Sequence, residues 1–128
     1  MPVPDKASIR VVLAGRSELV ELLSDALRAP GIHILASCHD RGAALAAVRR
    51  ESPDVCIVDR ELDGGGLIAA AAVASPRPAP KVLVVGDQDA PAEKRAARLA
   101  GASAYLARSS DADTFLATVF QLGRSASS

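Results

Sequence analysis

Residues 52–66 read SPDVCIVDRELDGGG, and this stretch decides the fold. Ser52-Pro53 ends any helix that precedes it, because proline cannot continue a helix. Val55–Asp59 is short and apolar up to its last residue, which is typical of a buried strand. The turn at 61–66 ends in a run of glycines and leads into an alanine-rich segment. The stretch therefore predicts a strand, a turn and a helix, with a carboxylate at the carboxyl end of the strand.

The same strand-then-helix pattern recurs along the chain. Apolar runs bounded by proline and glycine predict further strands, and amphipathic spacing with capping residues predicts helices between them. We expect Ser17 and Asp40 to cap the first two helices, a capping box from Ser110 to Asp113 to open the last, and Gly123 to end it. The predicted strands are 9–14, 32–37, 55–59, 81–85 and 103–107.

Strict alternation of apolar strands with helices predicts an α/β protein whose parallel sheet is covered on both faces. Because crossovers are right-handed, the sheet is doubly wound. The common solution for five units is the flavodoxin-like strand order 2-1-3-4-5. The length of 128 residues fits one such domain.

Composition excludes several classes of function. Basic and acidic residues balance at 15 each, so nothing indicates the basic face that nucleic-acid binding needs. The longest apolar run, Leu67–Ala74, is too short to span a bilayer, and no signal peptide opens the sequence. Cys56 falls inside a predicted strand and Cys38 directly follows one, and the two lack metal-ligand spacing, which favours buried thiols in the cytoplasm.

In a doubly wound sheet, ligands bind outside the carboxyl ends of the strands. Asp59 is the one acid that ends a buried strand, although an ordinary helix cap or loop acid is an alternative reading of it. No nucleophile–base pair converges on this crevice, so an enzyme is the least favoured function. The residues that the strands deliver there are Gly15, Arg16, Asp59, Gly86, Asp87 and Arg108.

Four stretches together resemble the receiver domain of bacterial two-component response regulators, and most closely the type with a LuxR-like helix-turn-helix output domain. The resemblance covers residues 8–123. It leaves 1–7 as an N-terminal extension and 124–128 as a linker-like tail that would lead, in a longer protein, to a DNA-binding domain. The stretches are IRVVLAG at 9–15, SPDVCIVDRELDGGG at 52–66, KVLVVG at 81–86 and AGASAYLAR at 100–108.

The resemblance implies a role for each site residue. Asp59 matches the aspartate that accepts a phosphoryl group from a histidine kinase, and Glu61 would offer a backbone carbonyl to Mg²⁺. Tyr105 matches an aromatic residue that couples the pocket to the output face. Other positions depart from the family: Gly15 and Arg16 stand where two acids hold Mg²⁺, Gly86 where a Thr or Ser stands, Arg108 where a Lys stands, and Asp63 where a proline stands.

These departures suggest a pseudo-receiver. Phosphoryl transfer to a carboxylate needs a divalent cation, and Arg16 is a permanent cation that repels one. We expect Arg16, Arg108 or both to pair with Asp59, Mg²⁺ binding to be weak or absent, and no other cofactor. The expected function is regulation through protein contacts, with a homodimer as the first partner and a histidine kinase or other regulatory protein as the second. Two alternatives stay open: a receiver still phosphorylated at Asp59, and a small-ligand sensor that uses the same crevice.

Overall fold

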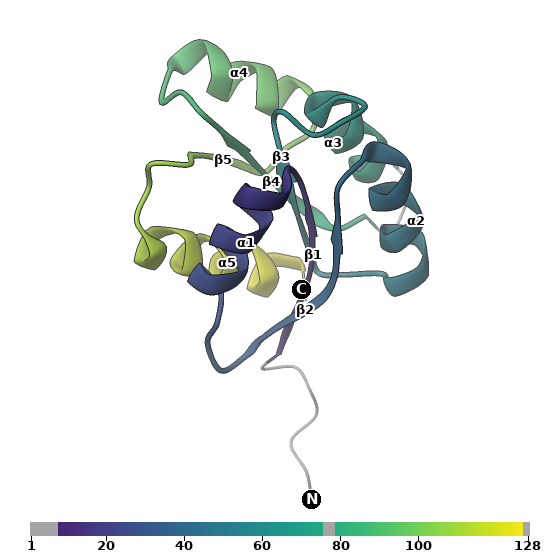
Figure 1. Cartoon of the computed structure of the whole chain (residues 1–128), viewed down its shortest axis with the longest axis vertical. Coiled ribbons are helices and arrows are strands. Elements are labelled where there is room, and N and C mark those ends of the chain that lie inside the picture. Colours follow the sequence, from purple (N-terminus) through teal and green to yellow (C-terminus); the bar gives the residue numbers. More distant parts are fainter. Residues whose placement is uncertain (1–7, 76–78, 127–128) are drawn as a thin grey trace, which may run out of the picture.

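The computed structural model describes residues 8–75 and 79–126, so the predicted extension at 1–7, the prolines at 76 and 78 and the last two residues lie outside the described part. Strands and helices alternate as predicted (Figure 1). The strands are β1 (Ile9–Ala14), β2 (Ile32–Cys38), β3 (Val55–Asp59), β4 (Lys81–Gly86) and β5 (Ala104–Ala107). The helices are α1 (Ser17–Ala26), α2 (Arg41–Glu51), α3 (Gly66–Ala74), α4 (Pro91–Leu99) and α5 (Ala112–Ala126).

The strands form one parallel sheet in the order β2-β1-β3-β4-β5, which confirms the predicted topology. β3 is central, and all five of its residues are buried. The chain reverses direction across the sheet between β1 and β3, so the loops that follow these two strands open a crevice at their carboxyl ends. Asp59 ends β3 at that crevice.

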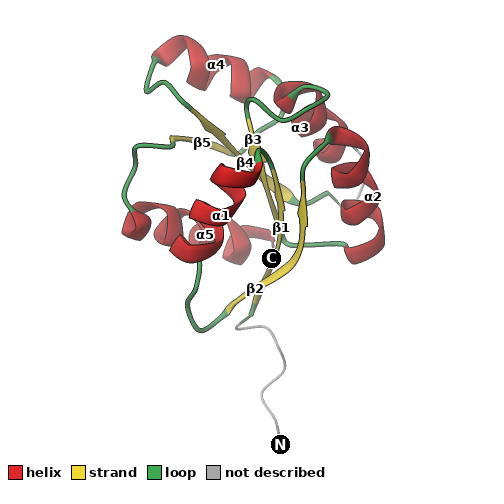
Figure 2. Ribbon diagram, in the orientation of Figure 1, coloured by secondary structure: helices red, strands yellow, loops and turns green. Residues whose placement is uncertain are grey.

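Helices cover both faces of the sheet, as Figure 2 shows. α1 and α5 pack on one face, where the core is built from large side chains such as Leu13, Ile57 and Phe115. α2, α3 and α4 pack on the other, where the helices contribute mainly alanines and β1, β3 and β4 contribute valines. Among the described residues, no helix is both long enough and apolar enough to cross a bilayer.

The run Gly64–Gly66 shapes the turn between β3 and α3. Gly64 and Gly65 have φ angles of +93° and +100°, a backbone conformation that side chains with a Cβ rarely adopt. Gly66 then begins α3 against the backbone of Asp59 and Arg60, where a Cβ would collide with their carbonyl groups. The glycines therefore hold a tight turn directly after Asp59.

Three predicted helix ends are wrong. The N-cap of α1 is Arg16, and Ser17 is already helical with no capping role. At α5 the side chain of Asp111, not of Ser110, accepts the backbone N–H of Thr114 at 2.7 Å. The helix also continues through Gly123 to Ala126, so the predicted tail at 124–128 is helical over its first three residues. The prediction at α2 is confirmed, because Asp40 accepts the N–H of Ala43 at 2.8 Å.

Candidate functional site

The carboxylate of Asp59 lies at the centre of the crevice, and only 1% of the residue is exposed. Arg16 lies between the end of the neighbouring strand β1 and the start of α1, and its guanidinium meets this carboxylate edge to edge. Nε lies 2.8 Å from Oδ2 and Nη2 lies 3.1 Å from Oδ1. The two-pronged pairing fixes the orientation of both groups and confirms the predicted Arg16–Asp59 contact.

Backbone amides complete the set of donors to Asp59. The N–H of Arg16 donates to Oδ2 at 2.9 Å, and the N–H of Glu61 donates to Oδ1 at 2.9 Å. Each carboxylate oxygen therefore accepts two hydrogen bonds, which matches the roughly four acceptor positions of an ionised carboxylate. Glu61 contributes its amide to the site here, whereas the family resemblance implied its carbonyl.

Burial and hydrogen bonding act in opposite directions on Asp59. Burial alone would raise the pKa of its carboxyl group, but the hydrogen bonds from Arg16 and Glu61 outweigh that effect and hold the pKa below its usual value. The same hydrogen bond to Asp59 raises the pKa of Arg16 further. Both groups are therefore charged at neutral pH, and the pair is a stable ion pair within the site.

Gly15 makes the close approach of Arg16 possible. A Cβ on Gly15 would lie 2.6 Å from the Cβ of Asp59 and 3.1 Å from its Oδ2. Any side chain at this position, including the acid that the family resemblance implied, would force the backbone away from Asp59.

Asp87 follows β4 and lies between the two arginines of the crevice. Its Oδ1 is 3.2 Å from Nη2 of Arg16 and 3.7 Å from Nη1 of Arg108. Arg108 thus pairs with Asp87, and no ion pair joins it to Asp59 among the described residues. The predicted site residues do come together, with Arg16 as the link between the two acids.

Gly86 and Tyr105 form the side of the site toward β5. The hydroxyl of Tyr105 donates to the backbone carbonyl of Gln88 at 2.6 Å, which holds the ring over the end of β4. A Cβ on Gly86 would lie 2.9 Å from Cζ of Tyr105 and closer still to its hydroxyl oxygen. The ring of Tyr105 therefore occupies the space that a side chain at position 86 would need, and it is half-buried there.

Two contacts that the sequence analysis missed fix the loop after Asp59. Arg60 pairs with Glu93 of α4, with Nε 2.8 Å from Oε1. Arg41, at the start of α2, donates to the carbonyl of Gly64 at 2.6 Å. Neither contact leaves a local signal in the sequence, because the partners lie 33 and 23 residues apart.

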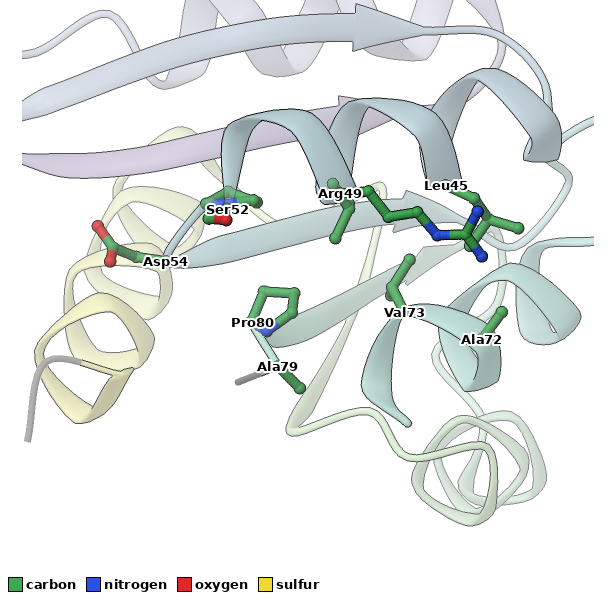
Figure 3. A pocket seen from close by; sticks show the side chains of 10 residues that line it. Leu45, Arg49, Ser52, Asp54, Ala72, Val73, Ala79 and Pro80 are labelled. Carbon is green, nitrogen blue, oxygen red and sulfur yellow. The ribbon is translucent and has the colours of Figure 1, made fainter. Parts of the chain in front are cut away.

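A cavity of about 330 Å³ lies between α2 and α3, far from Asp59. Figure 3 shows Leu45 and Arg49 on the α2 side and Ala72 and Val73 on the α3 side. Asp54 and Pro80, which directly precede β3 and β4, place it at the amino ends of these strands. The cavity is therefore separate from the crevice in which the predicted site residues meet.

Metal-ligating side chains do not gather in the described part of the chain, where no group of three or more His, Cys, Asp or Glu residues could hold an ion. Both cysteines are buried and free, as predicted. Burial raises the pKa of Cys56 to about 12, so its thiol stays neutral. Neither Cys38 nor Cys56 contributes to the chemistry of the site.

Comparison with known proteins agrees with this fold. Residues 15–120 match the model of the response regulator receiver domain family. The signal receiver domain of the response regulator NarL from Mycobacterium tuberculosis superposes with a TM-score of 0.85 at 28% identity, over 91% of this chain and 97% of that one. No protein in the curated set matches the sequence.

Two further solved structures extend the likeness. A LuxR-family two-component response regulator from Aurantimonas sp. SI85-9A1 has a TM-score of 0.83 at 26% identity, over 92% of this chain and 86% of that one. A response regulator from Chloroflexus aurantiacus has a TM-score of 0.83 at 22% identity, over 91% and 98% of the two chains, which speaks for the fold alone.

Proposed function

The chain belongs to the family of response regulator receiver domains, and we propose that it is a pseudo-receiver, a regulatory module that acts through protein contacts without Mg²⁺-dependent phosphorylation of Asp59. A receiver domain is the regulated part of a two-component signalling protein. What distinguishes this one is the set of groups around its acceptor carboxylate.

The observation that carries the proposal is the saturation of Asp59. Its two oxygens accept four hydrogen bonds, three of them from Arg16. A metal ion or an incoming phosphoryl group would have to displace the guanidinium, and that displacement would leave a buried carboxylate without its main partner.

Mg²⁺ does not fit the residues present. The ion needs near-octahedral oxygen ligands, but position 15 has no side chain and position 16 carries a fixed positive charge that already contacts Asp59. Asp87 is not available as a metal ligand either, since its carboxylate contacts both Arg16 and Arg108. The arginine side chain neutralises the two acids in place of a metal ion.

The second departure concerns signal output. Gly86 offers no hydroxyl that could reach a phosphoryl group, and Tyr105 already fills the space beside it. Hydrogen bonds therefore fix the side chains on both sides of the site. Arg16 is bound to Asp59 on one side, and Tyr105 is bound to the carbonyl of Gln88 on the other. We propose that this module presents one constant surface to its partners.

The likeness to NarL and LuxR regulators supports a place in a cytoplasmic transcriptional regulator, in which a DNA-binding domain would follow residue 128. Regulation would then depend on which partners the module contacts, with a second copy first and a histidine kinase or other regulatory protein second. The module itself carries out no catalytic step in this proposal.

Phosphorylation chemistry provides the test. The protein is incubated with acetyl phosphate and Mg²⁺, or with beryllofluoride and Mg²⁺, and is followed by intact mass and by amide NMR, with Asp59→Asn as the control. We expect no phosphoryl adduct and no amide shift around residue 59. An adduct that is absent in Asp59→Asn would overturn the proposal in favour of a receiver that is still phosphorylated. Unchanged spectra until a small metabolite is added would instead favour a ligand sensor.

A further inference from the structure

The outer face of α1 carries an acidic stripe. Glu18, Glu21, Leu22 and Asp25 are all exposed and follow helical spacing, so they share one side of the helix. Leu22 lies among the three acids with 48% of its surface exposed. Asp25 pairs loosely with Arg28 at 3.4 Å, whereas Glu18 and Glu21 have no ion-pair partner within residues 8–75 and 79–126. We call these four residues the α1 stripe.

The outer face of α4 carries the opposite charge. Lys94, Arg95, Arg98 and Leu99 are exposed, and Leu99 shows 82% of its surface to solvent. Lys94 pairs with Asp89 at 3.0 Å, while Arg95 and Arg98 have no ion-pair partner among the described residues. We call these four residues the α4 stripe. Each stripe thus combines three like charges with one exposed leucine, and two of its charges are unpaired.

The two stripes cannot meet within one molecule. α1 packs beside α5 on one face of the sheet, whereas Ala97 anchors α4 to the opposite face, together with α2 and α3. Figure 1 shows the two helices in these separate layers. A second copy of the chain, in contrast, presents a complementary stripe to each of them.

From this complementarity we infer that the protein associates head to tail, with the α1 stripe of one copy bound to the α4 stripe of the next. Glu18 and Glu21 would face Arg95 and Arg98, and the two leucines would be covered together. Because different surfaces meet, the interface is heterologous and can add further copies in a ring or chain. The inference names a partner for the protein contacts of the proposed function and rests on that function in this respect.

The expected association is weak, because two helix faces bury little area and charge complementarity contributes more to register and encounter rate than to affinity. Sedimentation velocity from about 10 µM to about 1 mM covers the range of such contacts. We expect the average mass of the wild-type protein to rise with concentration and to fall when salt is added, because salt screens exposed charges.

Charge reversal on one stripe at a time separates this mode from a symmetric dimer. Glu18→Lys/Glu21→Lys removes the acidic stripe, and Arg95→Glu/Arg98→Glu removes the basic one. Each variant alone should stay monomeric, because both of its stripes then carry net charge of the same sign. A 1:1 mixture should associate, because each variant keeps the stripe that the other has lost and the two reversed stripes are again opposite in charge. Leu99→Ser, which changes a largely exposed side chain, should weaken association without any change in charge.

Arg49→Glu/Arg50→Glu is the matched control, since it reverses two exposed charges on α2, outside both stripes, and should associate like the wild type. A wild-type protein that stays monomeric up to about 1 mM would overturn the inference. So would a dimer that survives both reversals, or a mixture of the variants that stays monomeric. Acetyl phosphate treatment of the same samples tests the proposed function separately, because phosphorylation of Asp59 and head-to-tail association can each be present without the other.

Discussion

Gly15 and Asp59 approach each other more closely than a residue with a side chain would allow, since a Cβ on Gly15 would lie 2.6 Å from the Cβ of Asp59. This approach brings the N–H of the next residue, Arg16, to 2.9 Å from Oδ2 of Asp59. The absence of a side chain at position 15 therefore has two effects. It removes a possible metal ligand, and it allows Arg16 to come close enough to pair with Asp59.

Gly15→Ala should destabilise the protein although it adds a single methyl group. The new Cβ has no space beside Asp59, and overpacking of a close-packed site costs about 1–3 kcal/mol. The free energy of unfolding in urea measures the effect. Gly42→Ala is the control, because a Cβ there meets only Asp40 Oδ1 at 3.4 Å, and alanine is the better helix former by up to about 1 kcal/mol. Equal effects at the two positions would contradict the steric explanation.

Removal of the guanidinium should leave Asp59 buried without its main partner. We expect Arg16→Ala to lower the free energy of unfolding by about 2–3 kcal/mol, since Asp59 is 1% exposed and Arg16 is 30% exposed. Arg16→Lys keeps the charge but lacks the planar fork, so it should fall between the wild type and Arg16→Ala. Arg28→Ala removes a surface ion pair and should change stability by less than about 0.5 kcal/mol. If Arg16→Ala were as mild as Arg28→Ala, the pair would contribute little to stability.

Asp59 should also make stability depend on pH on the acid side. Its pKa is held below the unfolded value by the hydrogen bonds that outweigh burial, so its contribution is complete above the unfolded pKa of about 4 and is lost as the pH falls through the folded pKa. The difference in urea midpoint between the wild type and Asp59→Asn should therefore be constant from about pH 5 to 7 and should shrink below about pH 4. Because the pKa of Asp111 is also lowered, by its hydrogen bonds from Thr114, Asp111→Asn serves as a second reference. A difference that grows on acidification would reverse the assigned sign.

Local sequence signals were sufficient for most of the fold. Val55–Asp59 is a strand over the predicted residues, because an apolar run between Pro53 and a glycine turn leaves little freedom for its ends. The end of α5 was missed for a tertiary reason. Gly123 stays helical where β1 packs against it, and a Cβ on it would lie 2.5 Å from Cγ2 of Ile9. A glycine that usually ends a helix is used here for close packing, and no local pattern distinguishes the two uses.

The sequence was enough to predict which residues lie in the site, but only part of which residue pairs with which. In a parallel sheet the carboxyl ends of the strands meet at one edge, so the strand order alone places four residues there, independent of side-chain conformation. They are Arg16, Asp59, Asp87 and Arg108. Which arginine reaches which acid depends on side-chain direction. Arg16 reaches both Asp59 and Asp87, and Arg108 only Asp87, among the described residues. The pairing of Arg60 with Glu93 joins distant positions, so it required the structure.

Gly86→Ser should displace the ring of Tyr105. The new Cβ would lie 2.9 Å from Cζ of that ring, so the hydroxyl has to leave the carbonyl of Gln88 and the ring has to turn toward solvent. The sequence holds one tyrosine and no tryptophan, so intrinsic fluorescence reports on Tyr105 alone. We expect iodide to quench the Gly86→Ser variant more strongly than the wild type, and the tyrosine pKa, which burial raises in the wild type, to fall toward its usual value.

Tyr105→Phe removes the hydrogen bond to Gln88 and leaves Gly86 in place, so its fold, followed by far-ultraviolet circular dichroism, should match that of the wild type. If quenching and pKa are unchanged in Gly86→Ser, the free space at position 86 is not what allows the ring of Tyr105 to lie over the end of β4.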